Sequence, residues 1–389
     1  AHLVFDAVEG VTNAVEQMHV NIAATPSRLI PGATPSNNSH GLIASAVYRS
    51  ICGVNATLRG TVTAASALAP NGAQATPHQN TIKAIAALNG VAGDHLEATG
   101  NPLAINMGLF AGRRRLDLDA SELAAALPKV TPHIVVFAHG LAMSEVSWHR
   151  EGQADLGEQL AGERGQSALY LRYNTGRHIS SNGREFAELL ETLCDAWPVP
   201  VQSLSLIGYS MGGLLVRSAC WYAQQQQAAW LANLQRVVFI GTPHHGAPLE
   251  KAGHLLDRAM LATPFTAPLA FGRKRSAGIK DLRHGNLLDE DWQGHDPDAH
   301  GADTRQPVPL LDHVDYYFAA ATLGSDPEDP LGHALGDLLV RLGSALGEHP
   351  HELRHMGIDP AHCRVFHERH HLDLLYDERV HRQVIDWFR

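Results

Sequence analysis

The chain has 389 residues, of which 44% are hydrophobic and 18% charged, and its formal net charge is −10. This composition is typical of a soluble globular protein that is long enough to build a large core. The excess of acidic residues argues against a nucleic-acid-binding protein, which needs a basic face. No apolar run approaches the 18 residues that a membrane-spanning helix requires.

The start of the chain and its cysteines bear on its compartment. Residues 1–4 lack the basic and apolar regions of a signal peptide, although the missing initiator methionine leaves open that one was removed. The four cysteines are too few for a disulfide framework in so long a chain. Both observations favour a cytoplasmic location. We expect the 25 histidines to belong to a histidine-tolerant surface rather than to a metal site.

Residues 1–85 are predicted to form a helical N-terminal extension. Apolar residues recur every three or four positions between Val4 and Ile22, and again between Ile43 and Leu58. Pro26 and Pro31 separate the two runs. The polar faces of these helices carry few lysines and arginines, so we expect packing within the protein rather than on a membrane surface.

Residues 86–389 are predicted to form one α/β domain. After a predicted hairpin within 101–119, strand and helix patterns alternate, which indicates a doubly wound, mostly parallel sheet with helices on both faces. The predicted strands are 103–110, 113–118, 133–138, 168–173, 204–207, 237–240, 314–321 and 363–367. The predicted helices are 155–163, 181–197, 213–227 and 379–388.

An insertion at about 249–305 interrupts this alternation, because no core strand is predicted between Gly241 and Val314. An insertion here would lie over the carboxyl ends of the strands, where ligands bind in parallel sheets. We predict a lid that shapes an apolar pocket, with Leu255, Phe265 and Leu269 contacting substrate. The alternative is a long connection that packs on the side of the domain.

The segment Gly208-Tyr209-Ser210-Met211-Gly212 lies between a predicted strand and a predicted helix. A G-x-S-x-G pattern in this context is typical of a nucleophile elbow, whose tight turn exposes the serine hydroxyl at the edge of the sheet. The alternative, a Gly/Ser loop that only caps a helix, does not account for the strand before it. We predict that Ser210 is a nucleophile.

A serine nucleophile needs a base that takes its proton and a carboxylate that orients the base. In this kind of sheet the acid and then the histidine follow the serine along the chain. His371 is the predicted base because it follows the last predicted strand. His370, which is adjacent, and His367, within that strand, remain alternatives.

The predicted carboxylate is Asp337, which follows the predicted strand 314–321. Asp326 and Asp329 lie closer to the end of that strand and compete with it. An aspartate that only caps a helix is the non-catalytic interpretation of Asp337.

Hydrolysis through serine also needs backbone N–H groups that stabilise an oxyanion. We expect one from Met211, directly after the nucleophile, and one from Leu141, in the loop after strand 133–138. Gly140 lets that loop turn, and His139 is expected to position it rather than transfer protons.

Three segments together resemble the α/β-hydrolase superfamily, namely 135–141, 208–213 and 241–248. Within it they are most similar to bacterial lipases and esterases related to GPI-inositol deacylases. The resemblance covers about residues 130–389.

Two further segments resemble the family's acid and histidine motifs. Residues 336–341 resemble the acid turn G-D-G-x-V-P, but Leu338 and Arg341 stand where glycine and proline are usual. Residues 371–375 are similar to the H-x-x-L-L motif around the catalytic histidine. The resemblance thus favours Asp337 and His371 as the acid and the base.

The resemblance implies hydrolysis of a carboxylic ester through an acyl-enzyme, without a cofactor. The implied substrate is a small-molecule or lipid ester with an apolar acyl group, with transient contact to a lipid surface. An acyltransferase or thioesterase that uses the same three residues is the main alternative, and a noncatalytic binding module on this scaffold is another. No motif of a P-loop or dinucleotide-binding enzyme is present. The sequence predicts neither acyl length nor oligomeric state.

Overall fold

The computed structural model describes residues 79–127, 129–247, 275–295, 303–325 and 336–389. All of them belong to one compact unit, His78–Ala259 with Arg275–Arg389. A second unit, Ala1–Pro77 with Met260–Lys274, lies outside the described residues, so most of the predicted extension stays a prediction. The predicted boundary at residue 85 falls inside helix α3, Gln79–Ala98, which belongs with the sheet-bearing unit.

The described residues form an eight-stranded sheet with the order β2-β1-β4-β3-β5-β6-β7-β8. The strands are β1 Gly108–Ala111, β2 Arg114–Arg115, β3 His133–Ala138, β4 Ser167–Arg172, β5 Ser203–Tyr209, β6 Leu234–Ile240, β7 Asp315–Thr322 and β8 Cys363–His367. Every neighbouring pair from β4 through β3 to β8 is parallel, and β1 pairs antiparallel with both β2 and β4 at one edge. The predicted mostly parallel sheet is confirmed.

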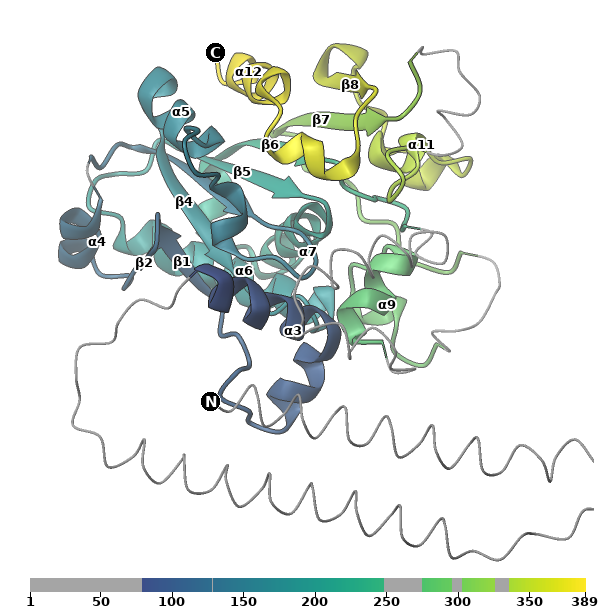
Figure 1. Ribbon diagram of the computed structural model, residues 1–389, viewed down its shortest axis with the longest axis horizontal. Helices are drawn as coiled ribbons and strands as arrows, with labels where there is room; N and C mark the ends of the chain where they lie inside the picture. Colours follow the sequence, from purple (N-terminus) through teal and green to yellow (C-terminus); the bar gives the residue numbers. More distant parts are fainter. Residues whose placement is uncertain (1–78, 128, 248–274, 296–302, 326–335) are drawn as a thin grey trace, which may run out of the picture. The chain divides into compact units, whose positions relative to one another are not determined.

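Helices cover both faces of this sheet. They are α3, α4 Ala120–Ala126, α5 Leu156–Arg164, α6 Ile179–Ala196, α7 Met211–Gln226, α9 Ala277–His284, α11 Leu342–Ala345 and α12 Glu378–Trp387. The helices α6 and α7 pack on one face, and α5 and α12 pack on the other (Figure 1). The doubly wound arrangement therefore matches the prediction.

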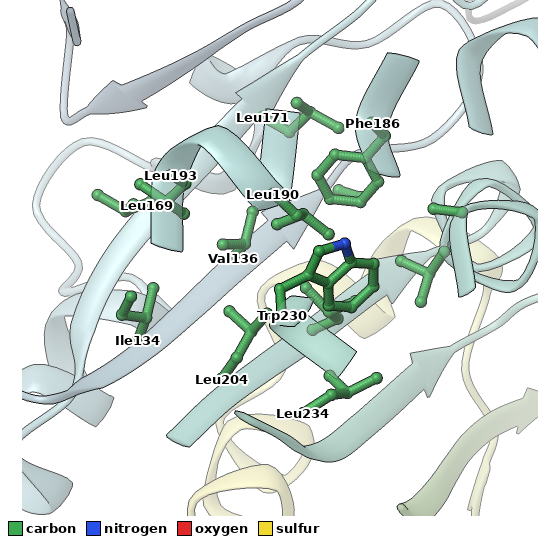
Figure 2. Close-up of a cluster of buried hydrophobic side chains, with 14 of the residues drawn as sticks. Ile134, Val136, Leu169, Leu171, Phe186, Leu190, Leu193, Leu204, Trp230 and Leu234 are labelled. Atoms are coloured by element: carbon green, nitrogen blue, oxygen red, sulfur yellow. The ribbon is translucent and has the colours of Figure 1, made fainter. Parts of the chain in front are cut away.

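The core lies on both faces of the sheet because successive side chains of each strand point to opposite sides. In β3, Ile134 and Val136 pack toward α6, whereas Val135 and Phe137 pack toward α5. Figure 2 shows the first of these layers, in which Trp230 lies among side chains from the sheet and α6. Burial on both faces explains why the strand is apolar at every one of these positions.

Local signals explain where the helices begin and end. Asp155 caps α5 by accepting the Glu158 N–H at 2.9 Å, and the Glu158 side chain accepts the Asp155 N–H in return. Gly165 ends the helix in the left-handed region, with φ 63°. The bounds of α5 therefore differ by only one residue from the predicted helix 155–163.

The described part of the predicted insertion contains one α-helix, α9, which the sequence analysis did not predict. Ser276 begins it, and the Ser276 hydroxyl donates to the Gly90 carbonyl of α3 at 2.7 Å. Asp94 of α3 accepts the Ala277 N–H at 3.0 Å. Within 275–295 and 303–314 no strand is present, as expected. The predicted lid residues Leu255, Phe265 and Leu269 lie outside the described residues, so their contacts remain predictions.

None of the helices in the described ranges combines the length and the hydropathy that a bilayer span demands.

Candidate active site

Ser210 occupies the turn between β5 and α7 in a conformation that side chains rarely adopt, with φ 54° and ψ −123°. Such backbone strain costs about 1–3 kcal/mol and is held by its surroundings. Here the Ser210 N–H donates to the Ile240 carbonyl at 2.8 Å, and the Ser210 carbonyl accepts the Gly213 N–H at 3.0 Å. The serine is partly exposed. Its hydroxyl therefore stands at the carboxyl end of β5.

The glycines on either side of Ser210 have a steric cause. A Cβ on Gly208 would lie 2.5 Å from the Gly213 Cα, and one on Gly212 would lie 2.2 Å from the Ala138 carbonyl oxygen. No side chain fits at either position, because the first turn of α7 packs directly against the ends of β5 and β3. This packing accounts for the G-x-S-x-G pattern at this turn.

Asp337 and His371 form a buried hydrogen bond of 2.6 Å between Asp337 Oδ2 and His371 Nδ1. Their exposed fractions are 1% and 4%. Asp337 Oδ1 accepts the backbone N–H groups of Leu339 at 3.0 Å and Val340 at 2.8 Å. The carboxylate is thus held on both oxygens, with one of them fixing the orientation of the imidazole. The competing Asp326 and Asp329 lie outside the described residues.

His371 contacts the residues that frame Ser210. The Tyr209 hydroxyl donates to the His371 carbonyl at 3.1 Å. A Cβ on Gly241, the residue after Ile240, would lie 2.9 Å from His371 Cε1. His371 Nε2 is buried and has no hydrogen-bond partner among the described residues, Ser210 Oγ included. Asp337 therefore orients the imidazole of His371 through Nδ1, and its other nitrogen, Nε2, has no hydrogen-bond partner in the described ranges.

The two other candidate histidines have different surroundings. His370 is exposed, and its backbone N–H donates to Asp373 at 2.8 Å. His367 Nδ1 lies 3.2 Å from the Gly324 carbonyl oxygen. Neither histidine bonds to Asp337.

The loop after β3 lies against the Ser210 turn. A Cβ on Gly140 would lie 3.2 Å from the Ser210 Cβ. Leu141 and Met211, the two expected N–H donors, belong to the same apolar cluster beside α9. Neither of their N–H groups donates to an acceptor in the part of the chain that the structure describes. Both donors therefore remain available for a ligand.

His139 holds this loop through a defined tautomer. His139 Nε2 accepts the Tyr173 N–H at 3.4 Å, so Nδ1 carries the proton that it donates to the Gly140 carbonyl at 2.9 Å. The Tyr173 hydroxyl donates to the His139 carbonyl at 2.8 Å. Burial lowers the pKa of His139 to about 3, so the ring stays neutral at physiological pH. These contacts fit a positioning role.

Sequence analysis missed several residues that shape the site. Tyr209 supports His371, and Thr175 Oγ1 accepts the N–H of Ala142, which has a φ of 58°. Leu338, directly after Asp337, has a φ of 80°. For Leu338 a signal existed, because the resembled motif has glycine there. The tyrosine and threonine contacts join residues that lie far apart in the sequence, so no local sequence pattern signals them.

Histidines and cysteines elsewhere do not form a metal centre in the described ranges, where no three possible ligands come together. Cys194, Cys220 and Cys363 are free thiols.

Comparison with known proteins gives one family match. Residues 129–262, which contain β3 to β6 and Ser210, match the family described as "Putative serine esterase (DUF676)". No curated protein matches the sequence.

Several solved structures are similar in part. The mature lipase BlEst2 of Bacillus licheniformis is 17% identical with a TM-score of 0.45, and the match covers 72% of this chain and 97% of that one. An esterase from Pyrobaculum calidifontis is 15% identical with a TM-score of 0.40, covering 68% and 76%. The phospholipase PlaB of Legionella pneumophila is 17% identical with a TM-score of 0.34, covering 55% and 45%. The chain thus combines a doubly wound, mostly parallel α/β sheet with a segment, residues 129–262, that matches a serine esterase family.

Proposed function

We propose that this protein is a serine carboxylic-ester hydrolase that works through an acyl-enzyme on Ser210. The observation that carries the proposal is the pairing of a strained, partly exposed serine with a buried Asp337–His371 hydrogen bond beside it. The family match over residues 129–262 supports the same chemistry.

The first step forms the acyl-enzyme. Ser210 Oγ attacks the ester carbonyl carbon while His371 Nε2 takes the hydroxyl proton. Asp337 keeps the proton of His371 on Nδ1, so that the unpartnered Nε2 is the proton acceptor, and it stabilises the imidazolium that forms. The imidazolium then gives its proton to the departing alkoxide, which leaves as an alcohol.

The charge that develops on the carbonyl oxygen is bound by backbone N–H groups in this proposal. The donors are the N–H groups of Met211 and Leu141, neither of which has another acceptor among the described residues. Loss of one such donor lowers the rate about 100-fold or more. A water molecule, activated by His371, then hydrolyses the acyl-enzyme and regenerates Ser210.

The test is labelling with a fluorophosphonate, read by mass spectrometry, together with release of p-nitrophenol from its acyl esters. We expect the label on Ser210 and loss of both labelling and hydrolysis in Ser210→Ala. Replacing His371 by alanine should have the same effect on hydrolysis. The matched control is His370→Ala, because this neighbouring ring is exposed and does not bond to Asp337.

Hydrolysis by Ser210→Ala, or a label on another residue, would rule the proposal out. If H370A rather than H371A abolished hydrolysis, His371 would lose its role. Product analysis in water with an added alcohol separates hydrolysis from acyl transfer, since a transferase would deliver the acyl group mainly to the alcohol.

A further inference from the structure

A cavity of about 300 Å³ lies away from the residues assigned to the reaction. One wall is Arg217 on α7, and others are His244 and His245, in the loop after β6. Arg217 is seven positions beyond Ser210, about 10 Å along the helix axis. Ser210, Asp337, His371, Leu141 and Met211 do not line this cavity. It is therefore distinct from the ester site.

Arg217 is a buried cation without an ion-pair partner among the described residues. Its exposed fraction is 8%. Nη2 donates to the Val308 carbonyl at 2.8 Å, and Nε is buried without an acceptor. Burial lowers the pKa of Arg217 to about 10, so the guanidinium is still charged at neutral pH. An unpaired buried charge is costly, which makes a missing counter-ion the simplest physical explanation.

The neighbouring histidines add more unsatisfied nitrogens to the same cavity. Both ring nitrogens of His244 and the Nε2 of His245 are buried without partners. His244 is only 1% exposed. Burial holds the pKa of His244 far below its ordinary value and lowers that of His245 to about 4, so both rings are neutral. The neutral ring of His244 offers one N–H donor, which suits an oxygen ligand.

Among the described residues, Arg217 makes no ion pair with the other charged groups that line the cavity, Asp312 included. Arg305 and Arg354 also line it, and both face one carboxylate, Asp303, at 2.7 Å and 3.5 Å. Asp291 lines the cavity too, but its oxygens accept backbone N–H groups, including that of Gln306 at 2.8 Å. It lies beyond ion-pair distance of Arg217.

We infer that this cavity binds a small organic anion whose carboxylate or phosphate group bonds to Arg217. Water could satisfy the unpartnered nitrogens, but it could not balance the charge. The cavity is larger than a bare ion needs, and Pro309, Leu310 and Met356 supply apolar walls for a short carbon chain. The anion therefore has an oxyanion head and an apolar body.

The inference is tested by calorimetric titration and thermal unfolding with hexanoate, hexyl phosphate and inorganic phosphate, at constant ionic strength in chloride. We expect at least one probe to raise the Tm by about 2 °C at ten times its dissociation constant. Comparing hexanoate with hexyl phosphate shows whether the site prefers a carboxylate or a phosphate group. Arg217→Met should weaken binding at least about tenfold, because a charge-assisted bond is lost.

The matched control is Arg382→Met, which removes an exposed arginine paired with Glu163 on α5 and should leave binding unchanged. If R217M does not fold, R217K keeps the charge without the planar fork and should bind more weakly than wild type. The inference is overturned if no probe binds wild type, or if the Arg217 variants bind as tightly as wild type. Binding by Ser210→Ala should persist, so this result does not depend on the proposed esterase activity.

Discussion

Ser210 and Leu338 of the candidate site, like Ala142, hold positive φ angles although they are not glycine. For Ser210, with φ 54°, the proposed chemistry needs the hydroxyl, so the strain has a use. For Leu338, with φ 80°, no contact of its half-buried side chain explains the conformation. The turn itself requires it, because the following N–H groups of Leu339 and Val340 must point at Asp337 Oδ1.

Replacing Leu338 with glycine should therefore stabilise the protein. Relief of the left-handed strain is worth about 1–2 kcal/mol, and the greater freedom of glycine in the unfolded chain offsets part of it. We expect the free energy of unfolding, measured in urea, to rise by about 0.5–1 kcal/mol. Leu339→Gly is the control and should destabilise, because its φ is not positive and it packs against an apolar cluster. A stability of L338G below that of wild type would contradict this explanation.

Single site residues can be predicted from the sequence where the residues next to them form a recognisable motif. Ser210 follows from its flanking glycines, and Asp337 and His371 from chain order and motif. The structure brings the last two within 2.6 Å of each other. It also shows what the sequence could not, namely that the Tyr209 hydroxyl supports the backbone of His371. That contact joins residues 162 positions apart, and no local pattern encodes it.

Among the structural elements, the loop after β3 controls how closely the expected oxyanion donors approach Ser210. Gly140 is the closest approach, since a Cβ there would lie 3.2 Å from both the Ser210 Cβ and the Tyr209 ring. A contact of this length forces the loop to move by a few tenths of an ångström. Because catalysis depends on the position of the donors, such a shift should affect rate more than stability.

We expect Gly140→Ala to lower kcat for p-nitrophenyl esters about tenfold or more, with a small change in KM and in Tm. The matched control is Gly162→Ala in α5, where an added Cβ meets nothing within 4 Å. That variant should keep its activity and gain about 0.5–1 kcal/mol of stability from helix propensity. Unchanged kcat in G140A would show that the loop tolerates the methyl group and does not position the donors.

The predictability of an element depends on whether its cause is local. The strands β3 and β8 have the predicted bounds, and in β3 an apolar run between polar residues defines them. Helix α9 was missed, because its first residues are held by Gly90 and Asp94 of α3, more than 180 positions earlier. Such long-range contacts determine the described part of the insertion, and periodicity does not report them.

At the scale of the whole molecule, the histidines that are buried as neutral rings in the folded protein make its stability depend on pH. Burial lowers the pKa of His139 to about 3 and of His245 to about 4. It also lowers the pKa values of His244 and His381. The sequence gives 25 histidines but cannot say which ones packing removes from water. The pKa of His149 is raised instead, because burial lowers it less than the hydrogen bond and the charge of Asp155, with nearby carboxylates, raise it.

These shifts predict that the protein loses stability as the pH falls below about 6.5. The unfolded chain binds protons at these histidines there, whereas the folded protein does not until its lower pKa values are reached, so acid favours unfolding. His139, His244 and His245 each lower the free energy of unfolding by about 1 kcal/mol between pH 6.5 and 5.5; His381 acts in the same direction, and His149 offsets part of the sum.

Urea unfolding at pH 7.5, 6.5 and 5.5 measures this slope. His244→Phe should reduce it by one histidine's share, because the ring already packs against Phe239 and Phe318 and phenylalanine cannot bind a proton. A stability that stays constant between pH 7.5 and 5.5 would mean that these rings reach solvent in the folded protein. An unchanged slope in H244F would mean that the His244 ring alone reaches solvent. It would then not be a buried, unpartnered group in the wall of the proposed anion cavity.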